Sequence, residues 1–340
     1  DTYGFPIDLT ELIAREQGVE VDLPGFEKEL RAQKERSRNA AAVSADDWHE
    51  LMPIRESEFV GYDTLSERVR IARYRSVQSK GKTSYQLVFD RTPFYGNSGG
   101  QIGDIGYIEQ EGDRIPVVAT EKENGLIVHI TQRLPENPEG EFTAVVDPEK
   151  RQSAANNHTA THLLHEALRR VLGTHVEQKG SLVTPEYLRF DFSHFQKVTT
   201  EELREVERLV NRAIRANYPL VENRNATREE AEACGAMMLF GEKYGDRVRM
   251  VRFGTSVELC GGTHTSATGN IGMCKIVSEG AVSAGVRRIE AVTGEAVEKI
   301  VYAAEDTLRN VGEYLNNPQV LQAVRKLMEN NETLRGEVEA

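Results

Sequence analysis

Two short runs of potential metal ligands, far apart in the sequence, most constrain the fold of this chain. They are His158-Thr-Ala-Thr-His162 and Cys260-Gly-Gly-Thr-His264. Residues four apart on a helix share one face, so His158 and His162 can direct two imidazoles at one ion. The two glycines after Cys260 let a loop curl until its thiol and imidazole converge. Because paired nitrogen and sulfur donors suit tetrahedral zinc, we expect a fold that packs a helix against this distant loop.

Neither run is convincing alone, since two histidines four apart on a helix are commonly unconnected. Together they predict zinc but leave its role open: four protein donors usually close a structural site, whereas a catalytic site keeps one position for water. An intermediate role, in which zinc organises a pocket and binds part of a substrate, is a third reading. The zinc-protease pattern HExxH fails, because Thr159 stands where its glutamate is needed and Ala160 and Thr161 follow it. His165 lies on a neighbouring helix face and reads as a packing histidine.

Size and composition bound the class of protein. With 340 residues, the chain is expected to form two or three domains. Its 39% hydrophobic and 28% charged residues fit a soluble globular protein, and its apolar stretches are too short to span a membrane. Three cysteines argue against a disulfide framework and for a reducing, cytoplasmic compartment. Since the chain begins with Asp1 rather than Met, we read it as a piece of a larger protein.

The net charge of −12 argues weakly against a nucleic-acid partner. Binding depends on local basic surface rather than on the sum of charges, however. Two local basic groups occur, and for each the alternative reading is solvated surface charge: Lys243, Arg247, Arg249 and Arg252, and the pair Arg287-Arg288.

Changes in residue pattern divide the chain into four parts and predict a multidomain α+β protein. Residues 1–50 read as a helical segment, with helices over Asp8–Gln17 and Phe26–Ala42. Residues 51–147 carry short β-forming runs separated by turn residues, which suggests a small β-barrel. Residues 148–294 read as an α+β domain that holds the zinc. Residues 295–340 read as C-terminal helices whose apolar spacing suits a helical hairpin or coiled coil, with packing on their own domain as the equal alternative.

The ligand-bearing helix has clear ends. Asp147 is a plausible N-cap with Pro148 at the first helical position, and Gly173 stops the helix. A second helix is predicted from about Thr200 to Asn217, capped by Thr199 or Thr200. Around these helices the pattern predicts a short helix near 228–234 and strands near 175–183, 187–193, 219–223, 237–240, 247–253, 273–278 and 286–292.

Five motifs in this order resemble bacterial alanyl-tRNA synthetases. The resemblance spans nearly the whole chain, and one departure is Gly96-Asn97, where the family loop often has Pro-Glu. The motifs are Asp1-Thr-Tyr-Gly-Phe-Pro-Ile-Asp-Leu-Thr10, Pro93-Phe-Tyr-Gly-Asn-Ser-Gly-Gly-Gln-Ile-Gly-Asp104, His158-Thr-Ala-Thr-His162 with Gln178-Lys-Gly-Ser181, Cys260-Gly-Gly-Thr-His264, and Gly285-Val-Arg-Arg-Ile-Glu290.

The resemblance implies an activity. The family joins alanine to tRNA-Ala with ATP, and hydrolyses Ser-tRNA-Ala and Gly-tRNA-Ala at a separate zinc site. The ATP and alanine site would precede Asp1, so we do not expect this chain to aminoacylate by itself. We expect it to act as the editing hydrolase, with Zn²⁺ as cofactor and mischarged tRNA-Ala as partner, without a membrane, and with a homodimer formed through the C-terminal helices as one arrangement.

Residue roles follow the resemblance. Zinc would be held by His158, His162, Cys260 and His264. Gln178 resembles a family residue that lines the editing pocket and would hydrogen-bond the substrate, and Ser181 lies close to it in sequence. Thr159 and Thr161 are alternatives for sensing the hydroxyl of serine, or simple helix residues. Because no strong candidate base is visible, positioning and electrostatics would carry most of the rate.

Three rival readings remain. The first is a free-standing editing protein, although the motif at Asp1 and the helices after Glu295 speak against it. The second is a zinc-stabilised tRNA-binding module without hydrolysis, and the third is a dimerisation fragment. A phosphate-binding P-loop in the glycine-rich stretch after Pro93 is disfavoured, because no Gly-Lys-Ser or Gly-Lys-Thr follows.

Overall fold

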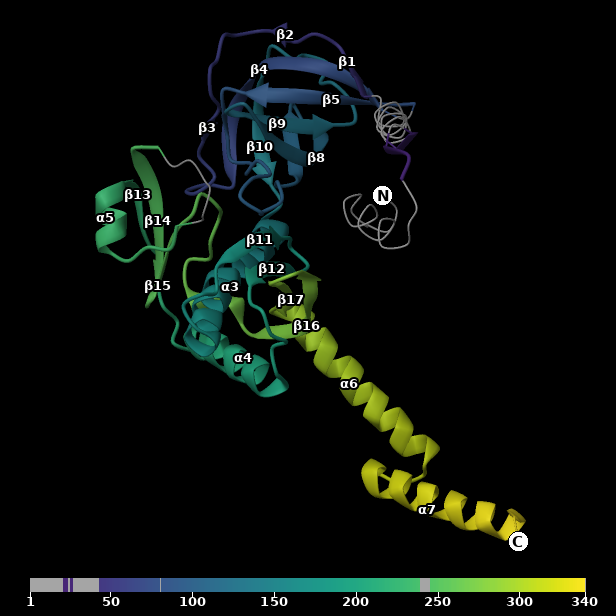
Figure 1. Ribbon diagram of the computed structural model, residues 1–340. Helices are drawn as coiled ribbons and strands as arrows, with labels where there is room; N and C mark the ends of the chain where they lie inside the picture. The colour runs from purple at the N-terminus through teal and green to yellow at the C-terminus, as the bar shows by residue number, and fades with distance from the viewer. Residues whose placement is uncertain (1–20, 24, 27–42, 80, 239–244, 340) are drawn as a thin grey trace.

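The computed structural model describes residues 21–23, 25–26, 43–79, 81–238 and 245–339. Several sheets and helices build this part of the chain, which confirms the predicted multidomain α+β class. A β-barrel sits above an α+β unit, and two helices extend away from that unit on the far side (Figure 1). Of the two helices predicted before residue 43, Asp8–Gln17 lies outside the described residues, and so does all but the start of Phe26–Ala42.

A closed ring of strands forms the barrel. The order β4-β10-β7-β8-β9-β5 ends on a pairing between β5 and β4, so this ring has no free edge in the described residues. Two short strands also pair with β4, and a separate two-stranded sheet joins β3 to β6. The strands are β1 Val43–Ala45, β2 His49–Glu50, β3 Glu58–Phe59, β4 Ser66–Ser79, β5 Lys82–Phe89, β6 Arg91–Thr92, β7 Gly106–Gln110, β8 Asp113–Glu123, β9 Leu126–Thr131 and β10 Glu141–Val146.

Turn chemistry sets the register of the barrel hairpins. Glu111 and Gly112 both have positive φ between β7 and β8, and Asn124 and Gly125 do the same between β8 and β9. Two consecutive positive φ values match the right-handed twist of hairpin strands. The alternating side chains then fill the barrel with Val, Ile, Leu and Phe, among which Phe89, Phe94 and Phe142 are fully buried.

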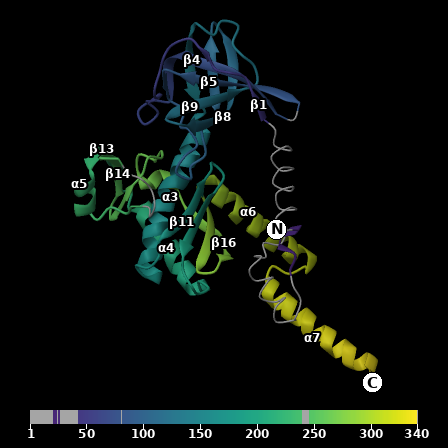
Figure 2. The same ribbon diagram turned by 45° about the horizontal axis from the view of Figure 1, so that its top comes forward.

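The helix α3, Pro148–Leu172, begins and ends where its sequence predicts. The Asp147 side chain accepts hydrogen bonds from the backbone N–H groups of Glu149 and Lys150, and Gly173 closes the helix with φ of 116°. Almost every residue from Ala154 to Leu168 is buried. The helix is buried on nearly all sides because the second helix and the sheet of the α+β unit pack along it, while its first turns meet the barrel (Figure 2).

A four-stranded antiparallel sheet supports α3 and the second helix, α4, Thr200–Arg215. Its order is β11-β12-β17-β16. Thr199 and Glu202 form a capping box that starts α4. Leucine, valine and phenylalanine side chains from both helices and the sheet pack into one core. The strands are β11 Gln178–Val183, β12 Leu188–Ser193, β16 Cys274–Ser283 and β17 Val286–Thr293.

A smaller three-stranded sheet lies beside this core and carries the second ligand run at its end. It consists of β13 Val221–Thr227, β14 Arg247–Phe253 and β15 Ser256–Leu259, with α5 Arg228–Ala233 packed on it. β15 was not predicted. The strand predicted over 237–240 appears in its described part only as one bridge from Met237 to Glu258, and residues 239 and 240 lie outside the described residues.

Two long helices follow the sheet. They are α6, Glu295–Tyr314, and α7, Val320–Glu339, and no residue of α7 is buried. Both project from the rest of the molecule as rods (Figures 1 and 2). Within the described residues, no helix is long and apolar enough to cross a membrane. We retain divisions after residues 50, 147 and 294 as our proposal for the domain boundaries.

Candidate metal centre

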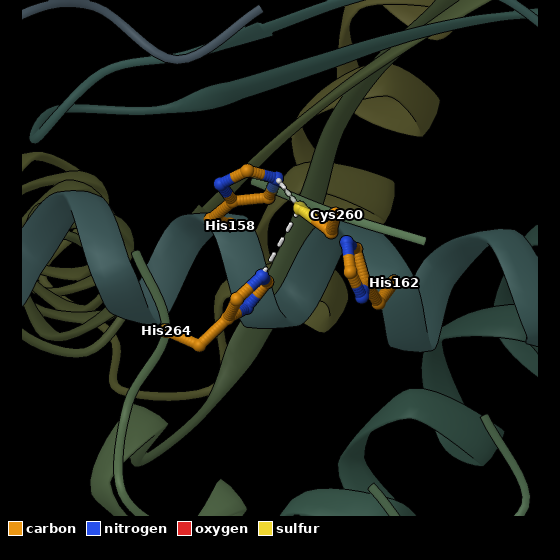
Figure 3. A group of neighbouring side chains, drawn as sticks. All are labelled: His158, His162, Cys260 and His264. Carbon is orange, nitrogen blue, oxygen red and sulfur yellow. Dashed lines mark hydrogen bonds between the residues drawn. The ribbon is translucent and has the colours of Figure 1, made fainter. Parts of the chain in front are cut away.

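The four predicted ligands meet at one point between α3 and the loop after β15. One donor atom from each of His158, His162, Cys260 and His264 lies within 4.8 Å of the others. The Cys260 sulfur is 3.4 Å from His158 Nε2 and 3.3 Å from His264 Nε2. Figure 3 shows the three imidazoles and the sulfur pointing toward one another. This arrangement could hold a metal ion, and its three nitrogens and one sulfur match the donors that zinc favours.

Close approach between the loop and α3 explains the second glycine of the loop. A Cβ added to Gly262 would lie 2.1 Å from His158 Cε1, whereas one added to Gly261 would meet nothing within 4 Å. The absence of a side chain is therefore required at Gly262 but not, for steric reasons, at Gly261. Gly262 is required for contact with the ligand histidine, and its backbone N–H also lies 3.3 Å from the Cys260 sulfur.

In His158 and His264, the Nδ1 atom, which does not contact the Cys260 sulfur, has its own partner. His158 Nδ1 lies 2.8 Å from Gln101 Oε1, which also accepts from the Thr263 backbone N–H. His264 Nδ1 lies 3.0 Å from the Thr159 hydroxyl. Such contacts fix the ring orientation of metal-binding histidines. Since Gln101 belongs to the glycine-rich loop of the barrel, the barrel takes part in building the site.

Burial keeps the imidazoles in the form that a metal needs. It holds the pKa values of His158 and His264 well below the ordinary value for histidine, and it lowers the pKa of His162. Neutral imidazoles are the ligand form. His162 Nδ1 is buried without a hydrogen-bond partner among the described residues. A buried cluster of neutral nitrogens around a thiol therefore fits a bound divalent cation better than a self-contained hydrogen-bond network.

A cavity of about 400 Å³ gives access to the cluster from the barrel side. Cys260, Gly261 and Gly262 form one wall. The opposite wall comes from the barrel and includes Phe59, Tyr62, Tyr95 and Lys122. A second cavity, of about 240 Å³, borders His264 on the other side of the loop. The larger cavity therefore ends at the ligand loop, beside Cys260.

Tyr62 and Arg249 hold the ligand loop in place through hydrogen bonds to its backbone. The Tyr62 hydroxyl donates to the Gly261 carbonyl at 2.5 Å, and the Arg249 guanidinium lies 4.1 Å from the Tyr62 ring centroid. Arg249 also donates to the carbonyls of Cys260 and Gly262, both at 2.8 Å. The loop is thus held by a barrel residue and by a residue of β14.

The predicted pocket residues have different surroundings. Thr159 touches His264 as described above, whereas the Thr161 hydroxyl donates to the Asn157 carbonyl within α3. The Ser181 backbone lies against Gly100 of the barrel loop, where an added Cβ would be 2.7 Å from the Ser181 oxygen. Gln178 begins β11 opposite Phe192. Neither Gln178 nor Ser181 is among the residues that line the two cavities beside the cluster, so their roles remain predictions.

Most of the basic residues noted in the sequence have partners in the fold. Arg249 pairs with Glu222, Arg287 with Glu279, and Arg288 with Asp191. Arg247 and Arg252 donate to backbone carbonyls. Lys243 lies outside the described residues. These partners favour structural roles over the nucleic-acid surface considered from sequence.

Sequence reasoning missed four residues that support the site. They are Gln101, Tyr62, Arg249 and a buried carboxylate, Glu258, which lies 3.2 Å from His165 and 3.6 Å from His162. For Gln101 a signal existed, because it stands in the glycine-rich stretch whose purpose was left open. Glu258 stands two residues before Cys260, and strand alternation could have placed both on one face.

Two family models match parts of the chain. Residues 1–148 match the model described as tRNA synthetases class II (A), and residues 248–290 match the second additional domain of threonyl and alanyl tRNA synthetases. The second match contains Cys260 and His264. It also covers most of β14, the whole of β15 and β16, and the first part of β17.

Curated relatives match the whole chain. The chain is 57% identical over 340 residues to an alanine–tRNA ligase of Bacteroides fragilis, and 56% identical over 342 residues to that of Bacteroides thetaiotaomicron. It is 51% identical over 350 residues to that of Flavobacterium psychrophilum. In each case all of this chain is covered, but it spans only 39–40% of the relative's length.

Proposed function

Because the chain belongs to the alanine–tRNA ligase family, as its 51–57% identity to curated members over its whole length shows, we propose that it is the editing portion of such an enzyme. Its reaction would be hydrolysis of Ser-tRNA-Ala and Gly-tRNA-Ala at a zinc site. Water adds to the ester carbonyl, the bond to the ribose oxygen breaks, and free amino acid and tRNA leave.

The observation that carries the proposal is the four-donor cluster at the wall of a cavity. Part of that cluster falls within the match to the additional domain of threonyl and alanyl tRNA synthetases. A second site has a physical purpose, since an alanine pocket gains only about 1–3 kcal/mol against a substrate that differs by one methyl or hydroxyl group. A separate hydrolytic pocket removes the errors that binding alone admits.

The side chains divide the work as follows. His158, His162, Cys260 and His264 hold the zinc, which when bound supplies a Lewis acid and a positive charge for the ester or the water. Thr159 keeps His264 oriented, and its hydroxyl is a candidate contact for the serine side chain. Gln178 and Ser181 are proposed to hydrogen-bond the substrate.

The main alternative is a zinc-stabilised tRNA-binding module that does not hydrolyse. Four protein donors favour this reading, because closed sites are usually structural. The cavity beside Cys260 favours hydrolysis, because it offers space for a small ligand next to a proposed metal ligand. In either case tRNA is the proposed partner.

Substitution of the thiol ligand tests the proposal. We expect Cys260→Ala to lose zinc and to slow deacylation of Ser-tRNA-Ala by about 100-fold or more, since even outer-shell changes cost about 10–100-fold. Cys234→Ala is the matched control, because Cys234 is exposed and outside the cluster. Metal content and deacylation of Ser-tRNA-Ala and Ala-tRNA-Ala are measured together. Retained zinc with an unchanged rate would defeat the ligand assignment, and an unmodified chain that binds tRNA but leaves Ser-tRNA-Ala intact would support the alternative.

A further inference from the structure

A buried carboxylate bridges a proposed zinc ligand and a histidine that is not a ligand. Glu258 of β15 is 6% exposed. One carboxylate oxygen lies 3.2 Å from His165 Nδ1, and the other lies 3.6 Å from His162 Nε2. The two histidines are three residues apart on α3, so both can face the same strand. Glu258 therefore joins the ligand helix to the strand that leads into Cys260.

The surroundings of Glu258 lack a permanent cation. Among the described residues, its ion-pair partners are these two imidazoles alone, with no lysine or arginine. A carboxylate out of water costs several kcal/mol unless a positive charge or hydrogen bonds compensate it. As a metal ligand His162 must be neutral, so among the described residues neither this imidazole nor any lysine or arginine places a permanent positive charge beside the carboxylate.

The net charge of the site with a bound divalent cation also favours a nearby carboxylate. Three neutral imidazoles and one thiolate around a divalent cation leave a single positive charge in a buried position. A carboxylate within 3.6 Å of one ligand balances that charge. The negative Glu258 carboxylate and the positive metal centre would thus compensate each other's charge.

We propose that Glu258 is a positioning residue for the metal centre: it orients His162, is itself held by His165, and supplies the negative charge that balances the bound divalent cation. This inference rests on the metal site of the proposed function. It gives His165 a role beyond packing, as the donor that fixes the carboxylate. It also explains why β15 lies against α3 immediately before the ligand loop.

Zinc affinity of the whole chain, measured by competition with a chelator and without tRNA, tests the inference. We expect Glu258→Gln, which keeps the shape and removes the charge, to weaken zinc binding by about 10–100-fold. His165→Leu should weaken it less, while His165→Asn, which keeps a donor near the same position, should restore much of the loss. Asp191→Asn is the matched control, because Asp191 is a buried carboxylate of the same unit that pairs with Arg288.

The outcomes separate the two proposals. Zinc affinity that depends on Cys260 but stays within twofold of the unmodified chain in Glu258→Gln overturns this inference alone. Zinc affinity that depends on neither residue overturns the metal site itself. An equal loss in Asp191→Asn would reduce Glu258 to a general stabiliser and also overturn the inference. If Glu258→Gln does not fold, the contrast between His165→Leu and His165→Asn decides, and the visible spectrum of the cobalt-loaded protein reports whether four donors remain.

Discussion

At the scale of single residues, the contact between Gly262 and His158 makes a sharp prediction. Gly262→Ala would place a methyl group 2.1 Å from His158 Cε1, 2.4 Å from its Nδ1 and 2.9 Å from Gln101 Oε1. The imidazole would have to leave its position toward the other donors. We therefore expect zinc affinity to fall by about tenfold or more, by analogy with other changes that disturb ligand orientation.

The neighbouring glycine provides the control for this change. Gly261→Ala adds a methyl group to open space, so zinc content should match that of the unmodified chain. Both variants are compared by chelator competition and by metal analysis of the purified protein. Equal affinities in the two variants would show that the loop does not approach His158 as described.

The residues of the metal site differ in how well the sequence predicts them. The ligands could be found because histidine and cysteine at spacings of four are chemically distinctive. Gln101 and Glu258 have only weak sequence signals, namely a glycine-rich stretch and a position two residues before Cys260, because an amide or a carboxylate becomes part of a metal site only when distant segments meet. Gln101 lies 57 positions before His158, and Glu258 lies 93 positions after His165.

At the scale of elements, β9 of the barrel carries a buried histidine that links stability to pH. His129 is fully buried, with its ring nitrogens 2.8 Å from the Thr92 hydroxyl and 3.1 Å from the Leu87 carbonyl. Burial lowers the pKa of His129 to about 3, against a small opposing effect of the Leu87 hydrogen bond. Between pH 3 and about 6.5 the unfolded chain therefore binds a proton that the folded barrel does not.

The sign of the effect follows from that difference in proton binding. The contribution is fully present above pH 6.5 and is lost as the pH falls toward 3, by up to about 1.4 kcal/mol per pH unit. We expect His129→Gln to show a smaller decrease in stability than the unmodified chain between pH 6.5 and pH 4.5. Urea unfolding, with hydrogen exchange of β9 amides as the local probe, measures this slope. Parallel pH curves for the two proteins would contradict the prediction.

Elements with strong local signals were predicted well. The sequence predicts α3 at its observed bounds because Asp147, Pro148 and Gly173 mark its ends. β15 was missed, since Ser256–Leu259 is short and lacks a run of β-branched residues. Its strand character comes from its pairing with the neighbouring strand β14.

At the scale of the whole molecule, one ion pair fixes the barrel on the ligand helix. Arg151 of α3 forms a buried pair with Asp104 of the barrel loop and donates to the carbonyls of Gly61 and Pro93, both at 2.7 Å. Periodicity of single segments cannot reveal this joint, nor the closure of the barrel between β4 and β5, because both depend on contacts across the fold. The joint keeps Gln101 beside His158, so the orientation of the barrel is a condition for the site.

The C-terminal helices give the last prediction, which concerns association of the chain with a second copy. On α7, Val320, Leu327 and Leu334 repeat every seven residues, with Val324 and Val338 four residues after the first and third of them, and none of α7 is buried. A seven-residue apolar repeat on an exposed helix is typical of a coiled coil. We expect the chain to form a concentration-dependent dimer, and we expect Leu327→Lys with Leu334→Lys, or removal of residues 295–340, to leave a monomer in gel filtration with light scattering. Zinc content should be unchanged in the lysine variant, because α7 lies far from α3, the helix that carries His158 and His162 (Figure 1). A chain that stays monomeric at every concentration would instead favour packing of these helices on another part of the same protein.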